Sequence, residues 1–181
     1  MTVRVLSAVM FGAVLLTAGS AVAQQPATPA APATNPLDVI PDKMPFSNPY
    51  GAPISLEKAD AAIAAGQAEA TKRGWQMNMA VVDSGGSLVA FRRMDGAQLA
   101  SISIAEHKAR AAVKFRRPTK VFEDAVQKGI VYIATLDDVV ASRGGIPLIE
   151  DGKIIGAIGC SGGTGSQDEA VCNVGAATIN K

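Results

Sequence analysis

The chain has 181 residues, 17 of them basic and 16 acidic, and its formal net charge is +1. This balance argues against a nucleic acid or an anionic membrane as a partner held by bulk electrostatics, because both favour a basic excess. The length suffices for one domain with its own hydrophobic core.

The chain begins with the three parts of a secretory signal peptide. Arg4 supplies the positive charge, Val5 to Ala18 the apolar core, and Ala21-Val22-Ala23 the small-residue cleavage site. The apolar run is shorter than the ~20 residues that span a bilayer, which favours cleavage over anchoring. We expect a signal peptide over residues 1–23 and a periplasmic or secreted mature protein that does not contact the membrane.

A proline-rich segment follows the predicted cleavage site. Eight of the ten prolines lie between Pro26 and Pro53. Alanine–proline sequence cannot bury a core and favours an extended, semi-rigid chain. The sequence therefore predicts a linker over residues 24–53 and a folded domain over residues 54–181.

The first part of the domain has the pattern of a helix and a β-hairpin. Ser55 suits a helix N-cap, apolar residues then recur at a spacing near 3.6, and Gly74 suits the helix end. Residues 75–83 and 87–94 are predicted to pair as antiparallel strands across the turn Ser84-Gly85-Gly86.

The rest of the domain also shows patterns of helices and strands. Pro118 must follow a helix end, an Asp-Gly pair suits a hairpin turn, and Ser166-Gln-Asp-Glu169 has the form of a capping box. The predicted elements are a helix over 98–116, a helix over 119–127 capped by Thr119, a strand over 130–135, strands over 144–149 and 153–160, and a helix over 166–179.

The order of these elements predicts the fold class. Hairpins imply antiparallel pairing, and helices between them can cover the sheet. We expect a single α+β domain whose antiparallel sheet of about five strands is flanked by helices in α/β/α layers.

Lys108 lies within the apolar arc of the 98–116 helix, and Ser101 lies two turns earlier on the same line. Burial of an unpaired ammonium is costly, so this lysine must reach water, pair with a carboxylate, or face a polar cavity or a subunit interface. Asp95 and Asp83 are the nearest candidate partners in the sequence. A lysine that only snorkels past the core is the alternative.

His107 is the only histidine of the chain. A single imidazole cannot build a metal cage, but it can be an axial ligand of haem or a general base, and a solvated surface residue is the alternative. Gly162 and Gly163 precede the last helix, where they can form a turn or cradle an anion.

The sequence contains no nucleophile elbow, which favours a binding protein over an enzyme. Cys160 and Cys172 are the only cysteines. A domain of this size does not need a disulfide, so we expect two free, partly buried thiols, with one bridge as the alternative.

Several short motifs occur in a specific order between about residues 56 and 177. They are Val81-Val82-Asp83-Ser84-Gly85-Gly86, Arg93-Met94-Asp95-Gly96-Ala97, Ile104-Ala105 with Lys108-Ala109, Arg117-Pro118-Thr119, Gly144-Gly145-Ile146-Pro147-Leu148, and Gly156-Ala157-Ile158-Gly159 with Ser161-Gly162-Gly163 and Asp168-Glu169. This set resembles the GlcG/HbpS family of haem-binding proteins, which is related to a domain fused to corrinoid enzymes.

The resemblance implies an antiparallel sheet with helices on both faces, assembly into homo-oligomers, and haem binding. In a haem-binding relative a histidine of the first helix ligates the iron. The aligned stretch Leu56-Glu-Lys-Ala-Asp60 has no histidine and places Asp60 there. This leaves His107, a hydroxyl group or a weak surface site as substitutes for that histidine.

The leading hypothesis is an exported protein that binds haem or a similar tetrapyrrole and takes part in haem or iron handling. Its expected ligand-binding residues are Lys108, Arg93, Asp95, His107, Ser101, Gly162 and Gly163, with His107 as the metal ligand. One alternative is an enzyme or small-organic-anion binder centred on Lys108, where Arg93 and Asp95 position the anion. Another is a structural oligomer in which Lys108 and Asp95 pair across subunits.

Overall fold

A computed structural model describes residues 39–180, and the compact unit that carries the domain begins at Lys43. The predicted signal peptide and residues 24–38 of the predicted linker lie outside the described residues, so both stay predictions. Within the described part, no helix is long and apolar enough to cross a membrane.

Helices and strands alternate along the described chain much as the sequence predicts. In chain order they are α1 (Leu56–Arg73), β1 (Asn78–Asp83), β2 (Leu88–Arg93), α2 (Ala100–Lys114), α3 (Lys120–Gln127), the 3-10 helix η2 (Val131–Thr135), β3 (Gly145–Glu150), β4 (Lys153–Ser161) and α4 (Gly165–Ala176).

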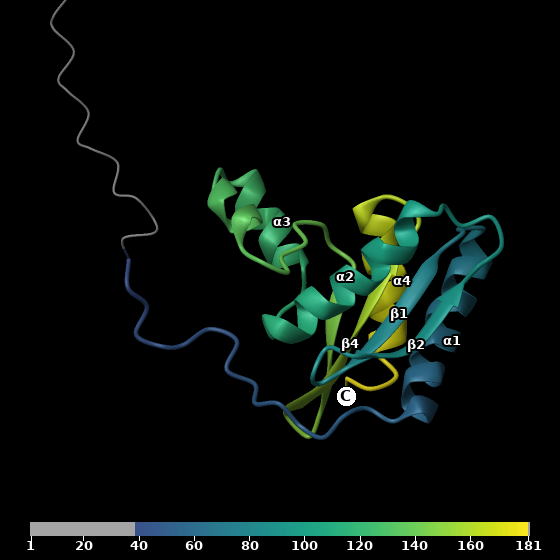
Figure 1. The fold of residues 1–181 in the computed structure, drawn as a ribbon, viewed down its shortest axis with the longest axis horizontal. Coiled ribbons are helices and arrows are strands. Elements are labelled where there is room, and N and C mark those ends of the chain that lie inside the picture. The colour runs from purple at the N-terminus through teal and green to yellow at the C-terminus, as the bar shows by residue number, and fades with distance from the viewer. Residues whose placement is uncertain (1–38, 181) are drawn as a thin grey trace, which may run out of the picture. The chain divides into compact units, whose positions relative to one another are not determined.

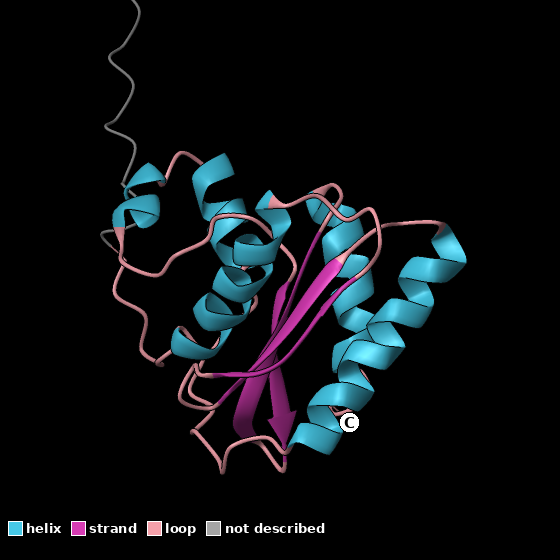
Figure 2. Cartoon of the chain, turned by 45° about the vertical axis from the view of Figure 1, so that its right-hand side comes forward, coloured by secondary structure: helices cyan, strands magenta, loops and turns pink. Residues whose placement is uncertain are grey.

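The strands form one antiparallel sheet in the order β2-β1-β4-β3. Helix α2 covers one face, where Ala109 packs with Ala80 and Ala157. Helices α1 and α4 cover the other face, where Ile63 and Val171 join a larger core cluster. The layers are visible in Figures 1 and 2. The predicted α+β class with α/β/α layers is confirmed.

The predicted strand over residues 130–135 is wrong, because this segment forms η2. It packs against α3, and Val131 and Tyr132 remain 64% and 50% exposed. A β-branched and aromatic composition favours a strand only where a pleated surface is there to receive it. The sheet therefore has four strands in the described residues, where about five were expected.

The helix caps are partly as predicted. Ser55 caps α1 by accepting a hydrogen bond from the amide of Lys58, and Gly74 ends the helix with a φ of 69°. The capping box of α4 begins two residues before the predicted one, since it is formed by Thr164 and Gln167. Thr119 does not cap α3 with its side chain; its hydroxyl accepts from the amide of Gly145 at 2.9 Å.

The chain just before α1 also contacts the domain. The amides of Gly51 and Ile54 donate to the carbonyls of Ile154 and Ile155, each at 2.8 Å. The Tyr50 hydroxyl donates to the carbonyl of Val113 at 3.0 Å. These bonds fasten the segment that precedes α1 to β4 and to the end of α2.

Two glycines let α2 lie directly on the sheet. A Cβ at Gly159 would lie 2.0 Å from the carbonyl oxygen of Ala105, and one at Gly145 would lie 2.3 Å from that of Lys108. Any side chain there would push the helix away from β3 and β4. This close approach brings Lys108 to the end of the sheet.

Cys160 and Cys172 form a disulfide, and both residues are fully buried. The prediction of free thiols is wrong. Cys160 lies on the face of β4 that α4 covers, and the packing of α4 brings the two Cα atoms to 5.7 Å, a separation that suits a disulfide. Sequence spacing alone does not reveal this approach.

The disulfide should stabilise the domain. The two cysteines are 12 positions apart in the sequence. In the chain-entropy model, closing such a loop destabilises the unfolded state by about 3 kcal/mol. We expect the Cys160→Ala/Cys172→Ala variant to lose about 2–4 kcal/mol of unfolding free energy in urea titrations. A variant as stable as the oxidised parent would contradict the bond.

Candidate functional site

Lys108 and Asp168 form a buried ion pair. The Lys108 Nζ and an Asp168 carboxylate oxygen lie 2.7 Å apart, and Lys108 is 1% exposed. Of the alternatives that the sequence leaves open for this lysine, the structure shows pairing with a carboxylate, but both candidate partners named from the sequence are wrong. Asp95 is exposed, and Asp83 accepts hydrogen bonds from amides of its own hairpin turn.

The ion pair joins four parts of the fold. Lys108 comes from α2 and also donates to the carbonyl of Cys160, at the end of β4, at 3.3 Å. Asp168 lies in the first turn of α4, and its second carboxylate oxygen accepts from the amide of Gly163 at 3.0 Å. The charges are thus compensated inside the chain, which is the condition for burying them.

A second group of polar side chains lies at the same end of the sheet. The Ser161 hydroxyl donates to the Ser101 hydroxyl at 3.0 Å, and the Gln98 amide donates to Ser101 at 2.7 Å. Asn78 donates to the carbonyl of Gln98 at 3.3 Å. The Asn78 Oδ1 is buried and has no hydrogen-bond partner within the described structure.

A hollow of about 240 Å³ adjoins this group, and Gln98, Gly162 and Gly163 are among its lining residues. Four predicted site residues therefore meet at one end of the sheet: Lys108, Ser101, Gly162 and Gly163. Arg93 and Asp95 are exposed at and just after the end of β2, and neither lines this hollow. Lys108 and Ser101 already have partners within the chain.

His107 lies apart from these residues. Its exposed side chain lines a different hollow of about 260 Å³, together with Arg110, Asp138, Val139 and Val140. Arg110 also pairs with Glu106 at 2.8 Å. The hollow therefore combines one imidazole and one guanidinium group with two aliphatic side chains and the carboxylate of Asp138, which pairs with Lys114 at 2.6 Å.

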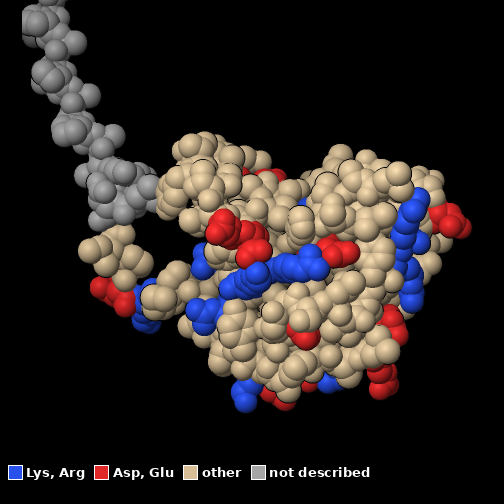
Figure 3. Space-filling view, in the orientation of Figure 1, with Lys and Arg blue, Asp and Glu red and all other residues tan. Residues whose placement is uncertain are grey.

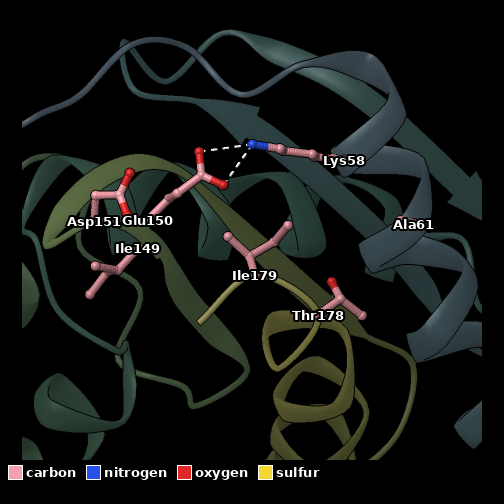
Figure 4. A pocket seen from close by; sticks show the side chains of 7 residues that line it. All are labelled: Lys58, Ala61, Ile149, Glu150, Asp151, Thr178 and Ile179. Atoms are coloured by element: carbon pink, nitrogen blue, oxygen red, sulfur yellow. Dashed lines mark hydrogen bonds and ion pairs between the residues drawn. The ribbon is translucent and has the colours of Figure 1, made fainter. Parts of the chain in front are cut away.

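A third hollow, a cleft of about 380 Å³, lies between the start of α1, the β3–β4 turn and the end of the described chain. Figure 4 shows Lys58 pointing across this cleft toward Glu150. The Lys58 Nζ donates to both carboxylate oxygens, at 2.6 and 2.8 Å. Sequence reasoning did not single out either residue, because they are 92 positions apart.

The described residues contain no group of three or more histidine, cysteine, aspartate or glutamate side chains that could hold a metal ion. Among the residues that sequence reasoning missed, Asp168 is the most important. Lys108 and Asp168 are 60 positions apart, so no local sequence pattern predicts that they pair. Only the place of Asp168 in the family motif draws attention to this residue.

On the face shown in Figure 3, basic and acidic side chains lie next to one another. Arg143 and Glu123 form one ion pair of the described chain, in which the Arg143 guanidinium lies 2.8 Å from the Glu123 carboxylate. This hydrogen bond is the main cause that holds the pKa of Glu123 below its ordinary value, although partial desolvation opposes the shift. A carboxyl group with a lowered pKa stabilises the fold while it is ionised.

The Glu123–Arg143 pair should make stability depend on pH. Because the folded-state pKa of Glu123 lies below that of an ordinary glutamate, the contribution of the pair is complete above the ordinary pKa and is lost as the pH falls through the folded-state pKa. We expect Glu123→Gln to lose at most about 1 kcal/mol at pH 7. Urea titrations should find the difference from the parent vanishing at low pH; a constant difference would contradict the linkage.

The buried pair between Lys108 and Asp168 should contribute far more to stability than the Glu123–Arg143 pair. Asp168→Asn leaves the Lys108 ammonium without its counterion, so we expect a loss of about 3–5 kcal/mol of unfolding free energy. The double variant Lys108→Met/Asp168→Leu removes both charges and should recover a large part of this loss. Urea unfolding of both variants checks this, and a double variant less stable than Asp168→Asn would contradict it.

Residues 54–177 match the family model described as haem degrading protein HbpS-like. The protein GlcG of Escherichia coli (strain K12) is 43% identical over 108 residues, which are 60% of this chain and 81% of GlcG. The resemblance inferred from the ordered motifs is confirmed by both comparisons.

Solved structures share the fold. A double mutant of HbpS from Streptomyces reticuli superposes with a TM-score of 0.67 and 27% identity, covering 83% of this chain and 100% of that one. The PduOC:heme complex superposes with a TM-score of 0.65 and 29% identity, covering 71% and 96%. One of these similar structures thus contains haem.

Proposed function

Because this chain belongs to the HbpS-like family, we propose that it is a haem-binding protein. The observation that supports this most directly is its similarity, over nearly the whole of that chain, to PduOC, which was solved as a complex with haem. Haem supplies four iron ligands of its own and needs one or two axial ligands from the protein. A chain without a cluster of metal-ligating side chains in its described residues is compatible with that requirement.

We propose His107 as the axial ligand. It is the only imidazole in the chain, and its hollow offers Val139 and Val140 as apolar contacts for a porphyrin ring. Arg110 can donate to a propionate, because its bond to Glu106 is partly exposed and easily exchanged. A hollow of about 260 Å³ is smaller than a usual ligand pocket, so we expect an open site.

Lys108 is a less favourable centre for a ligand site than His107, because its charge is already paired in the interior. An anion could reach Lys108 only by displacing Asp168 from a fully buried pair, which would leave a carboxylate without its counterion. The alternative of an anion site centred on Lys108 is therefore less favourable. A Lys108–Asp95 pair across subunits is unfavourable for the same reason.

The proposal also includes the cellular setting. The predicted signal peptide over residues 1–23 is the reason for including export to the periplasm or the outside, where the protein would handle haem or iron. Homo-oligomers, which the family resemblance implies, are part of the same proposal. Light scattering of the purified protein measures the assembly size.

Haem binding can be tested by hemin titration of the full chain, monitored by the Soret band. We expect saturation at stoichiometric hemin. Because loss of an outer-shell partner alone costs 10–100-fold in metal affinity, His107→Ala should weaken binding by about 100-fold or more. His107→Ala should also remove the spectral signature of imidazole ligation.

Ser103→Ala is the matched control, since Ser103 is also exposed on α2 and does not line the hollow. It should bind hemin like the parent. Absence of a Soret shift in the parent would refute haem binding. Unchanged affinity and spectrum in His107→Ala would refute His107 as the ligand and leave haem binding intact.

A further inference from the structure

The cleft at the start of α1 is separate from the proposed haem site. Its walls are Ala61 of α1, Ile149 at the end of β3 and Ile179 after α4. Its volume of about 380 Å³ lies within the range of pockets that hold small molecules. None of its lining residues lines the His107 hollow.

The Lys58 side chain shows what kind of group fits this cleft. It is an ammonium group on an aliphatic stem, and it binds both oxygens of Glu150 across the cleft (Figure 4). Lys58 and Glu150 are 44% and 41% exposed. An exposed pair of this kind contributes at most about 1 kcal/mol, so a similar group from outside can replace Lys58 at little cost.

The charges of the lining residues favour a cation. Glu150 and Asp151 each contribute a carboxylate, and Lys58 is the only basic lining residue. Asp151 forms no ion pair with another described residue. Two carboxylates are too few for a metal site among the described residues, and the aliphatic walls favour a ligand with an apolar body.

Asn180, next to Ile179, holds this wall of the cleft in place. Its side-chain oxygen accepts from the amide of Ile149 at 2.6 Å, and its side-chain amide donates to the carbonyl of Pro147 at 3.0 Å. These bonds fasten the segment that carries Ile179 to β3. A site whose walls are already in position loses less freedom on binding.

We propose that this cleft is a binding site for a small organic ammonium ion. Glu150 and Asp151 hold the charged group, and Ile149, Ile179 and Ala61 contact the aliphatic body. Lys58 is a built-in competitor that occupies Glu150 when no ligand is bound. The site does not depend on haem.

The test uses three probes of equal length: hexylammonium, hexanol and hexanoate. NMR titrations of the full chain with labelled isoleucine methyl groups follow Ile149 and Ile179. We expect hexylammonium to shift both signals, hexanol to bind about five-fold more weakly, and hexanoate more weakly still. Hexanoate binding as tightly as hexylammonium, or unchanged signals of both isoleucines, would overturn the proposal.

Single variants distinguish the role of Glu150 in binding from that of Lys58. Glu150→Gln should weaken hexylammonium binding about five-fold, whereas Lys58→Met, which keeps an aliphatic stem, should strengthen it about five-fold. Glu57→Gln is the control, because this exposed carboxylate of α1 does not line the cleft. If the first two variants bind like the control, the assignment fails. Hemin affinity should be the same in all of them.

Discussion

The pair between Lys108 and Asp168 is the constraint that most of the fold has to satisfy. A buried ammonium is tolerated only beside a fixed acceptor, so α2, the end of β4 and the start of α4 must meet at one point. The loop before α4 is fastened there too, through the amide of Gly163. A shift of any of these parts would leave a charge unpaired in the interior.

Two other features hold the same region together. Gly145 and Gly159 remove the side chains that would separate α2 from the sheet. On the opposite face, the Cys160–Cys172 disulfide joins β4 to α4. The end of β4 is thus held from both sides, by an ion pair toward α2 and by a covalent bond toward α4. This end of β4 therefore serves as a rigid scaffold.

The ion pairs that a ligand could replace lie elsewhere on the domain. Arg110 in the hollow beside His107 and Lys58 in the cleft are held by partly exposed pairs, with Glu106 and Glu150. Such pairs are weak enough to be replaced by a ligand. Haem and an organic cation would therefore bind at two places that share no lining residue.

Much of the local structure and the family can be read from the sequence. The cap of α1, the hairpin turns and the place of Lys108 in the apolar arc of α2 follow from spacing within a few residues, and ordered motifs identify the family. Four features become visible only in the folded domain: the partner of Lys108, the disulfide, the 3-10 helix at Val131–Thr135, and the separation of His107 from the glycine loop. These depend on contacts between residues far apart in the chain, such as the 60 positions between Lys108 and Asp168. No periodicity or local propensity encodes such contacts; they arise when the helices pack on the sheet.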